Sequence, residues 1–175
     1  MKITCITGTD LKGCTYKMKE IFLAQFPEAE IANIYLPSES PAYCTGCKNC
    51  FNLGEAYCPH SKQVQAIWQN MLGADLLVFA YPVYVMRAPG HVKSLLDHLG
   101  YNWFAHRPEP QMFSKTAAII TQSIGAPNGG AQKDVKTSLE WLGVSRIKTF
   151  SMGLMEGVIW DELSDKKRHA ITDKL

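Results

Sequence analysis

The chain has 175 residues, of which 46% are hydrophobic and 19% charged, a balance that excludes intrinsic disorder. The length fits one domain, residues 1–175, with a core that needs no covalent cross-links. The net charge of +2 forms no basic stripe, and no apolar run approaches the ~20 residues of a membrane span. We therefore expect a cytoplasmic protein with reduced thiols that binds neither nucleic acid nor membranes.

Hydrophobic periodicity predicts strands and helices in strict alternation. Runs rich in β-branched or apolar residues predict five strands, at about residues 3–7, 30–36, 75–81, 116–121 and 147–152. Apolar stripes at helical spacing predict a helix after each strand: one ending at Pro27, one from Ser61 to Gly73, one from Pro89 to Gly100, one between Gly130 and Gly143, and a last one that carries Leu163 and Ile171.

This βαβαβαβαβα order predicts a parallel sheet with helices on both faces. Residues 75–81 are almost uniformly apolar, which is typical of a central strand buried on both sides. Five strands in this length indicate a flavodoxin-like α/β fold with strand order 2-1-3-4-5 and a ligand at the carboxyl ends of the strands. Residues 37–59 show no period and predict a long, functional loop.

The loop after the first strand has the composition of a phosphate site. Gly8 and Gly13 permit tight turns, and the hydroxyls of Thr9 and Thr15, the side chain of Lys12 and backbone N–H groups can surround a phosphate at the helix N-terminus. The loop has neither the Gly-Lys-Ser/Thr of a Walker loop nor G-x-G-x-x-G. The alternative is a plain strand–helix turn in which Thr15 caps the helix.

The loop after the third strand, residues 81–89, is apolar and aromatic where a solvent-facing loop should be polar. A planar aromatic ligand explains this composition, because backbone N–H groups can bond ring heteroatoms while Tyr84 and Met86 pack nearby. Core packing at the strand end is the alternative. Gln122 and Ser123, after the fourth strand, are candidate polar contacts to the same ligand or parts of an ordinary connection.

Four of the six cysteines lie close together, at positions 44, 47, 50 and 58. The spacing C-x2-C-x2-C-x7-C-P suits thiolates that wrap an iron–sulfur cluster. Three alternatives stay open. Zinc usually takes two separate C-x-x-C pairs, a redox pair usually begins a helix, and free thiols can simply order the loop. Cys5 is predicted to be a small core residue.

Together these motifs resemble the NADPH-dependent FMN reductase family, a flavodoxin-like group that includes the iron–sulfur flavoproteins. The resemblance spans nearly the whole chain, through Gly8-Thr9, Gly13-Cys14-Thr15, Cys44-x-Gly46-Cys47, Ala80-Tyr81-Pro82-Val83-Tyr84 and His91-Val92-Lys93-Ser94-Leu95-Leu96-Asp97. Within the first loop, Asp10 and Leu11 stand where the family usually has proline and arginine. Lys12 is then the remaining cation beside a phosphate.

The resemblance implies an FMN cofactor, with its phosphate on the first loop and its ring along Pro82 to Arg87. The implied contacts are Thr9, Lys12, Gly13, Cys14, Thr15, Tyr16, Pro82, Val83, Tyr84, Val85, Met86, Arg87, Gln122 and Ser123. It also implies NAD(P)H as co-substrate and a homodimer or higher homo-oligomer. For part of the family it implies a [4Fe–4S] cluster, whose ligands here would be Cys44, Cys47, Cys50 and Cys58. The aromatic residues of the irregular stretch 101–113 would cover the flavin, form a dimer contact or pack on their own domain.

Our hypothesis is an FMN-dependent oxidoreductase of the flavin or quinone reductase type. It takes hydride from NAD(P)H and passes electrons to a small-molecule or protein acceptor, while the protein supplies an apolar slot and backbone donors. No side chain is assigned as a catalytic acid or base. The alternatives are an iron–sulfur or flavodoxin-type electron-transfer protein and a non-enzymatic metal-binding domain. The charge of +2 disfavours a carrier flavodoxin, because those are typically acidic.

Overall fold

The computed structural model of the chain describes residues 1–155 and 159–175. Five strands form one sheet in the order β2-β1-β3-β4-β5, and every neighbouring pair is parallel. Their bounds are β1 Lys2–Thr7, β2 Glu30–Tyr35, β3 Leu76–Pro82, β4 Thr116–Ser123 and β5 Arg146–Gly153. The predicted flavodoxin-like fold and strand order are confirmed.

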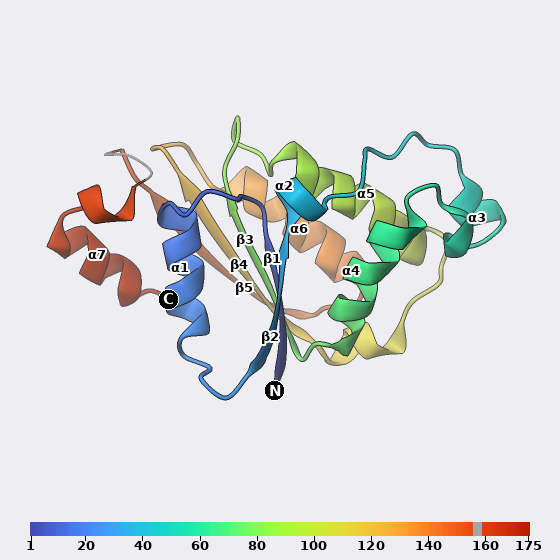
Figure 1. Cartoon of the computed structure of the whole chain (residues 1–175), viewed down its shortest axis with the longest axis horizontal. Helices are drawn as coiled ribbons and strands as arrows, with labels where there is room; N and C mark the ends of the chain where they lie inside the picture. Colours follow the sequence, from blue (N-terminus) through green and yellow to red (C-terminus); the bar gives the residue numbers. More distant parts are fainter. Residues whose placement is uncertain (156–158) are drawn as a thin grey trace.

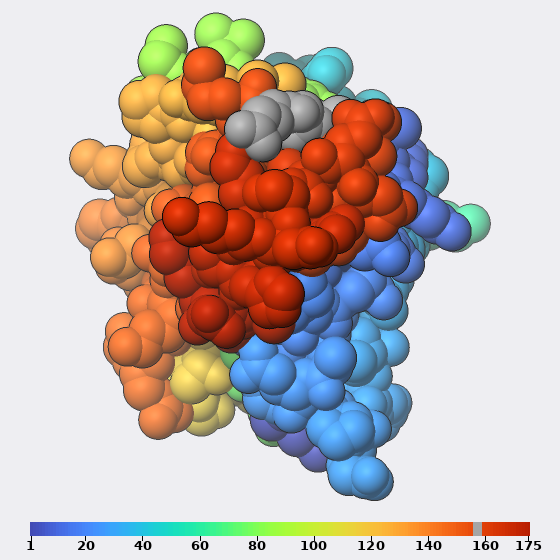
Figure 2. Space-filling view, turned by 90° about the vertical axis from the view of Figure 1, so that its left-hand side faces the viewer, coloured from blue at the N-terminus to red at the C-terminus, as the bar shows by residue number. Residues whose placement is uncertain are grey.

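Helices cover both faces of the sheet (Figure 1). One face packs against α4 (Ser61–Gly73), α5 (Gly90–Phe104) and α6 (Gly129–Trp141), and the other against α1 (Cys14–Leu23) and α7 (Asp165–Thr172). The C-terminal residues lie beside α1 and form a continuous surface there (Figure 2). None of the helices in the described ranges combines the length and the apolar character that a membrane crossing requires.

Strand β3 is the centre of the core, as its apolar sequence predicts. Its alternate side chains enter opposite cores: Phe79 and Tyr81 join the α4–α5–α6 side, whereas Val78 and Ala80 join the α1–α7 side. All four are fully buried. Since both faces of the strand are covered, its tip at Pro82 is fixed from both sides, and the loop that follows starts from a rigid base.

Strand β5 forms one edge of the sheet and is far less buried than β3. Two basic side chains, Arg146 and Lys148, are exposed along it. Phe150 and Met152, partly buried, pack against the core on the α1 side. Because alternate residues of a strand share a face, Arg146 and Lys148 lie on the same side of β5 as Phe150 and Met152, so this side changes from charged to apolar along the strand.

Two predictions about the connections are wrong. Helix α5 does not end at Gly100 but continues to Phe104, so the stretch after Gly100 is not irregular throughout. Residues 37–59 are not one featureless loop, because they contain the short helices α2 (Leu36–Glu39) and α3 (Asn49–Asn52) and a 3-10 turn at Glu55–Tyr57. A glycine inside a helix costs only about 1 kcal/mol, which the buried neighbours of Gly100 can offset.

Candidate functional site

The loops after β1, β3 and β4 meet at the carboxyl edge of the sheet and line one cleft. Its volume is about 100 Å³. The cleft is lined by Thr9, Leu11, Gly13, Cys14, Thr15, Pro82, Tyr84 and Gln122. Seven of these eight residues are among the sequence-predicted contacts, and the eighth, Leu11, comes from the same loop. Parallel strands place their carboxyl ends at one edge, which is why three distant loops converge there.

The first loop ends at the N-terminus of α1, whose N-cap is Gly13. No side chain in the described part of the chain caps this helix, so the alternative in which Thr15 caps it is not supported. Thr15 lies instead within the first turn and is buried. Thr9 shapes the loop by accepting a hydrogen bond from the Leu11 N–H, with a donor–acceptor distance of 3.1 Å. The uncapped N–H groups of α1 make this turn a suitable anion site.

Cys14, the first residue of α1, is the buried thiol of this cleft. Burial raises its pKa above the ordinary value for a thiol. A thiol that stays protonated adds no negative charge next to an anion site. Lys12 and Asp10, by contrast, are exposed on the outside of the loop.

The second loop folds back as a tight hairpin. Tyr84 and Arg87 exchange two backbone hydrogen bonds, of 3.0 and 2.9 Å. Between them Val85 and Met86 have positive φ angles of 49° and 60°, a conformation that is unfavourable for a β-branched residue. Val85 is 89% exposed and Met86 is 55% exposed. Strain of this kind is typically retained at functional sites.

Helix α6 holds this hairpin in place. The Asp134 carboxylate accepts hydrogen bonds from Arg87 Nη1 at 3.0 Å and from the Ala88 N–H at 3.2 Å. A Cβ atom on Gly130 would lie 2.7 Å from the Met86 carbonyl oxygen, so only glycine permits this close approach. Sequence reasoning missed Asp134, because an acidic residue one turn inside a helix gives no signal of a partner 47 residues away.

The third loop contributes Gln122 to the cleft, but Ser123 is turned inward. Its hydroxyl donates to the Ala126 carbonyl and accepts from Asn128 Nδ2 at 2.9 Å. The prediction of Ser123 as a direct side-chain contact is therefore not supported. Asn128 Oδ1 is the one buried side-chain oxygen or nitrogen without a hydrogen-bond partner among the described residues. Such an unpaired buried acceptor is unusual in a folded protein.

Tyr16 points away from the cleft, into a cluster below the first loop. Its ring lies 4.3 Å from the ammonium of Lys19, which is almost completely buried. Lys19 also lies 3.3 Å from the Tyr35 hydroxyl and 2.7 Å from the Glu20 carboxylate. The lysine is thus a buried structural cation on α1, and Tyr16 belongs to its surroundings rather than to the cleft lining.

The cysteine-rich loop leaves the carboxyl edge of the sheet and extends along α5. At its start, Ser94 Oγ donates to the Pro41 carbonyl at 3.2 Å, and His98 Nε2 lies 2.8 Å from the Ala42 carbonyl. Arg107 holds its middle by donating to the carbonyls of Cys50 and Phe51, both at 3.0 Å. Helix α3, which contains Cys50, lies far from the strand tips (Figure 1). Cys50 is therefore remote from the cleft at the strand tips.

All six cysteines are free thiols, and those at 44 and 47 are exposed. Burial raises the pKa of Cys50, and charges on Cys58 and Cys44 raise it further, which indicates that these three thiols are neighbours. Cys58 Sγ lies 3.8 Å from His98 Nδ1. Even so, within residues 1–155 and 159–175 no group of three or more Cys, His, Asp or Glu side chains is arranged to hold a metal ion.

The aromatic residues after Gly100 lie at the C-terminal end of α5, remote from the cleft at its N-terminal end. In the same chain they do not reach the cleft, because α5 runs away from the carboxyl edge of the sheet (Figure 1). Trp103 stacks on Trp141 with ring centroids 5.4 Å apart, and Phe104 meets Phe51 edge-on at 5.8 Å. Part of this stretch therefore packs on its own domain, although Phe104 stays 68% exposed.

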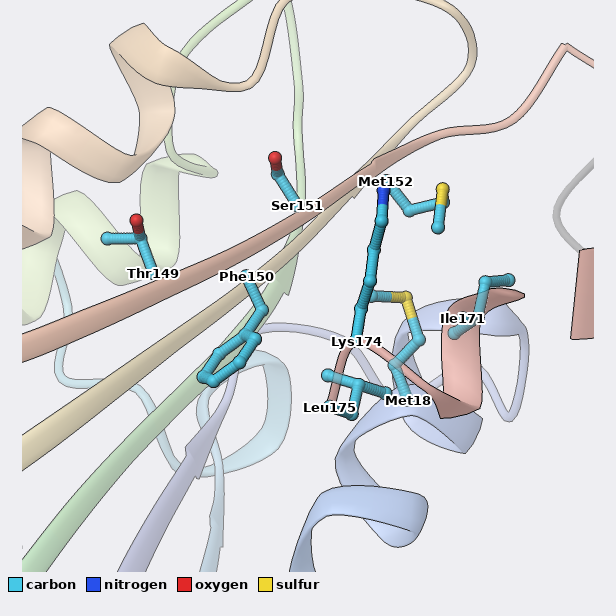
Figure 3. Close-up of a pocket in the computed structure, with 8 residues that line it drawn as sticks. All are labelled: Met18, Thr149, Phe150, Ser151, Met152, Ile171, Lys174 and Leu175. Carbon is cyan, nitrogen blue, oxygen red and sulfur yellow. The ribbon is translucent and has the colours of Figure 1, made fainter. Parts of the chain in front are cut away.

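A separate hollow of about 370 Å³ lies between α1, β5 and α7 (Figure 3). Met18 and Ile171 enter it from the two helices, and Ser151 lies on the strand beside it. Although it is larger than the cleft, none of the three predicted loops reaches it. We therefore place the functional site at the smaller cleft, where the loops converge.

Comparison with known proteins identifies the family of the chain. Residues 1–155 match the family model described as NADPH-dependent FMN reductase. An iron-sulfur flavoprotein of Methanosarcina thermophila is 26% identical over 149 residues, which cover 82% of this chain and 74% of that protein. One from Clostridioides difficile is 30% identical over 103 residues, 55% of this chain and 45% of that protein, so the match spans less than half of its length.

Solved structures share the fold at low sequence identity. An azoreductase from Bacillus anthracis str. Sterne has a TM-score of 0.74 at 19% identity, over 99% of this chain and 94% of that one. An NAD(P)H:quinone oxidoreductase from Methanothermobacter marburgensis has a TM-score of 0.71 at 16% identity, and the match covers 99% of this chain and 92% of that one. Because the family model covers most of the sequence, the chain belongs to the NADPH-dependent FMN reductase family and is an oxidoreductase that uses NAD(P)H and FMN.

Proposed function

We propose that the cleft binds FMN and that the protein passes electrons from NAD(P)H, through this flavin, to a separate acceptor. The observation that carries the proposal is the convergence of the loops after β1, β3 and β4 on one cleft. A phosphate-type loop and an apolar hairpin face each other across it, which matches the two ends of a flavin nucleotide.

The phosphate end fits the first loop. Backbone N–H groups at the start of α1 and the hydroxyls of Thr9 and Thr15 are donors suited to a phosphate. Lys12 is exposed on the same loop and does not line the cleft, so it would contribute at most from a distance. Because Leu11 provides no charge, most of this interaction would come from neutral donors and the helix dipole. We therefore assign the phosphate to the turn from Thr9 to Thr15.

The ring end fits the hairpin. The cleft volume of about 100 Å³ is below the ~300 Å³ of an ordinary ligand pocket, so it accommodates only part of an FMN molecule. The ring would lie over Pro82 and against the hairpin, where Tyr84 and Met86 are half exposed and available to pack on it. We assign Gln122, which lines the cleft, as the polar side chain at the edge of the ring.

When bound, FMN supplies the hydride and electron chemistry. The chain's own groups bind and orient it: the α1 N-terminus fixes the phosphate, and the rigid tip of β3 fixes the hairpin beneath the ring. Apolar side chains exclude water from one face, and backbone N–H groups stabilise negative charge that develops on the ring. The other face stays open for NAD(P)H and then for the acceptor.

The test begins with a flavin fluorescence titration of purified protein. We expect FMN to bind, and the loaded protein to oxidise NADH or NADPH when an acceptor such as a quinone is supplied. Comparing the two nucleotides gives the preferred reductant. A protein that is colourless as purified and leaves FMN fluorescence unchanged would refute the proposal.

A second candidate is an iron–sulfur flavoprotein with a [4Fe–4S] cluster on Cys44, Cys47, Cys50 and Cys58. The observations that favour it are the spacing of these cysteines, the proximity of three of the thiols, and the names of the two relatives. Since the sulfurs are not gathered in a ligating arrangement, the loop would have to adjust on binding. Iron and acid-labile sulfide analysis of anaerobically purified protein decides between cluster and free thiols.

We also propose that the protein forms a homodimer or a higher homo-oligomer in the cytoplasm. Large apolar side chains are exposed on loops around the cleft, and exposed patches of this kind often mark interfaces. They are Leu11, Tyr84, Val85, Met86, Ile124 and Met155. Sedimentation at micromolar concentration tests this, and a purely monomeric protein would contradict it.

A further inference from the structure

Gly8, just beyond β1, is hydrogen-bonded at both of its backbone groups. Its N–H donates to the Ala80 carbonyl of β3 at 2.8 Å. Its carbonyl lies 2.9 Å from Nε2 of His91, in the first turn of α5. One residue thus connects the start of the phosphate loop to the strand and to the helix that flank the ring hairpin.

The surroundings of Gly8 explain why a side chain from α5 makes this contact. A Cβ atom at position 8 would lie 2.7 Å from both Tyr81 Cβ and Val92 Cγ2. The peptide therefore sits directly on β3 and α5, and Gly8 is buried. A buried carbonyl without a donor costs about 1–3 kcal/mol, so the partner from His91 matters to the conformation of this peptide.

The direction of the hydrogen bond follows from the chemistry of its partners. A carbonyl oxygen only accepts, so Nε2 of His91 carries the proton and donates. Beyond Gly8 the loop turns outward: Asp10, Leu11 and Lys12 are exposed, and the next hydrogen bond is the internal one from the Leu11 N–H to Thr9. The His91 contact is thus the anchor at the base of the loop.

We propose that His91 is a positioning residue for the FMN phosphate. By holding the Gly8 carbonyl, it orients the turn from Thr9 to Gly13 so that its donors face the phosphate. This inference rests on the proposed FMN site. It assigns a function to a side chain outside the cleft lining. It also predicts that His91 affects binding of the phosphate and not binding of the flavin ring.

The experiment measures FMN and riboflavin affinities by fluorescence titration for wild-type, H91N and H91Q protein. Riboflavin lacks the phosphate, so it reports on the ring site alone. The amide N–H of glutamine lies at nearly the same distance from Cα as histidine Nε2. The asparagine side chain is one bond shorter, so its amide does not reach the Gly8 carbonyl. We expect H91N to weaken FMN binding about five- to tenfold, consistent with one lost hydrogen bond, and riboflavin binding less than twofold.

We expect H91Q to restore FMN affinity to within about twofold of wild type. Equal weakening of FMN and riboflavin in H91N, or an H91Q protein as weak as H91N, would overturn the inference and leave the FMN site intact. If H91N unfolds by circular dichroism, H91M takes its place as the non-donor of similar length. Wild-type protein that binds neither flavin would instead refute the proposed function, and the inference with it.

Discussion

Arg87 and Asp134 join the ring hairpin to α6, with Nη1 and Oδ1 3.0 Å apart. The carboxylate also accepts the Ala88 N–H, so one side chain fixes two consecutive residues of the hairpin. Arg87 itself is largely exposed, which limits the ion pair to about 1 kcal/mol or less. The contribution of Asp134 to FMN binding is therefore expected to come mainly from the shape it gives the hairpin.

Replacing Asp134 with alanine removes both contacts and should loosen the strained turn at Val85 and Met86. We expect FMN affinity to fall about tenfold in D134A and about threefold in D134N, whose amide oxygen still accepts from Ala88. Fluorescence titration measures both. The control is D97N, which removes the exposed ion pair of Asp97 with Lys93 on α5 and should leave FMN affinity unchanged. Equal effects of D97N and D134A would argue against the positioning role.

An alanine at position 8 should destabilise the protein. Its Cβ would meet Tyr81 and Val92 at 2.7 Å, and the backbone of β1 would have to shift. We expect a loss of about 1–3 kcal/mol in the free energy of unfolding, or roughly 2–4 °C of melting temperature for each kcal/mol. The matched control is G100A within α5, where no atom beyond the neighbouring residues and the local helix backbone lies within 4 Å of the added Cβ. That variant should be slightly more stable than wild type, and a G8A protein that melts no lower than G100A contradicts the prediction.

Arg107 should determine how well the cysteine-rich loop is ordered. Without its two hydrogen bonds to the carbonyls of Cys50 and Phe51, we expect α3 to open more often. Limited trypsin digestion of R107A should cut after the exposed Lys48 several-fold faster than in wild type, as measured by mass spectrometry. R146A serves as the control, because Arg146 makes one long contact of 3.5 Å to Ser114, outside this loop. Unchanged cleavage in R107A would show that the loop is held in another way.

We expect the buried Cys5 thiol to lower the free energy of unfolding at alkaline pH. Burial raises the pKa of its thiol to about 11, from an ordinary 9.0. Above pH 9 the unfolded chain releases this proton while the folded protein still holds it, so stability falls as the pH rises toward 11, by up to about 2 kcal/mol. Urea unfolding at pH 8, 9 and 10 should show a smaller decline for C5A than for wild type. Parallel declines would exclude Cys5 as the cause.

The sequence predicted the sheet, its order and most of the cleft, because these follow from local signals. Alternating apolar runs define the strands, and parallel topology brings their ends together whatever the details of packing. The partners of those loops were not predictable in the same way. Asp134 and His91 contact backbone groups 46 and 83 residues away, and neither contact leaves a periodic pattern.

The cysteine-rich loop shows the same limit. Its spacing correctly marked an unusual segment, but its path along α5 is determined by Ser94, His98 and Arg107, which the motif does not include. Gly100 was misread for a related reason. A glycine is a common helix end, yet here buried residues on both sides, such as Leu99 and Tyr101, continue the apolar stripe and outweigh the local preference.

The position of β5 at the sheet edge has a consequence for the behaviour of the protein in concentrated solution. An edge strand offers unpaired backbone groups to any other strand, and charged side chains are a common defence against such pairing. Arg146 and Lys148 would bring like charges together if two copies joined their sheets through this edge. Two molecules are therefore expected to repel each other along β5, which opposes aggregation by edge-to-edge strand pairing. Any association between copies should then use loops instead of this strand.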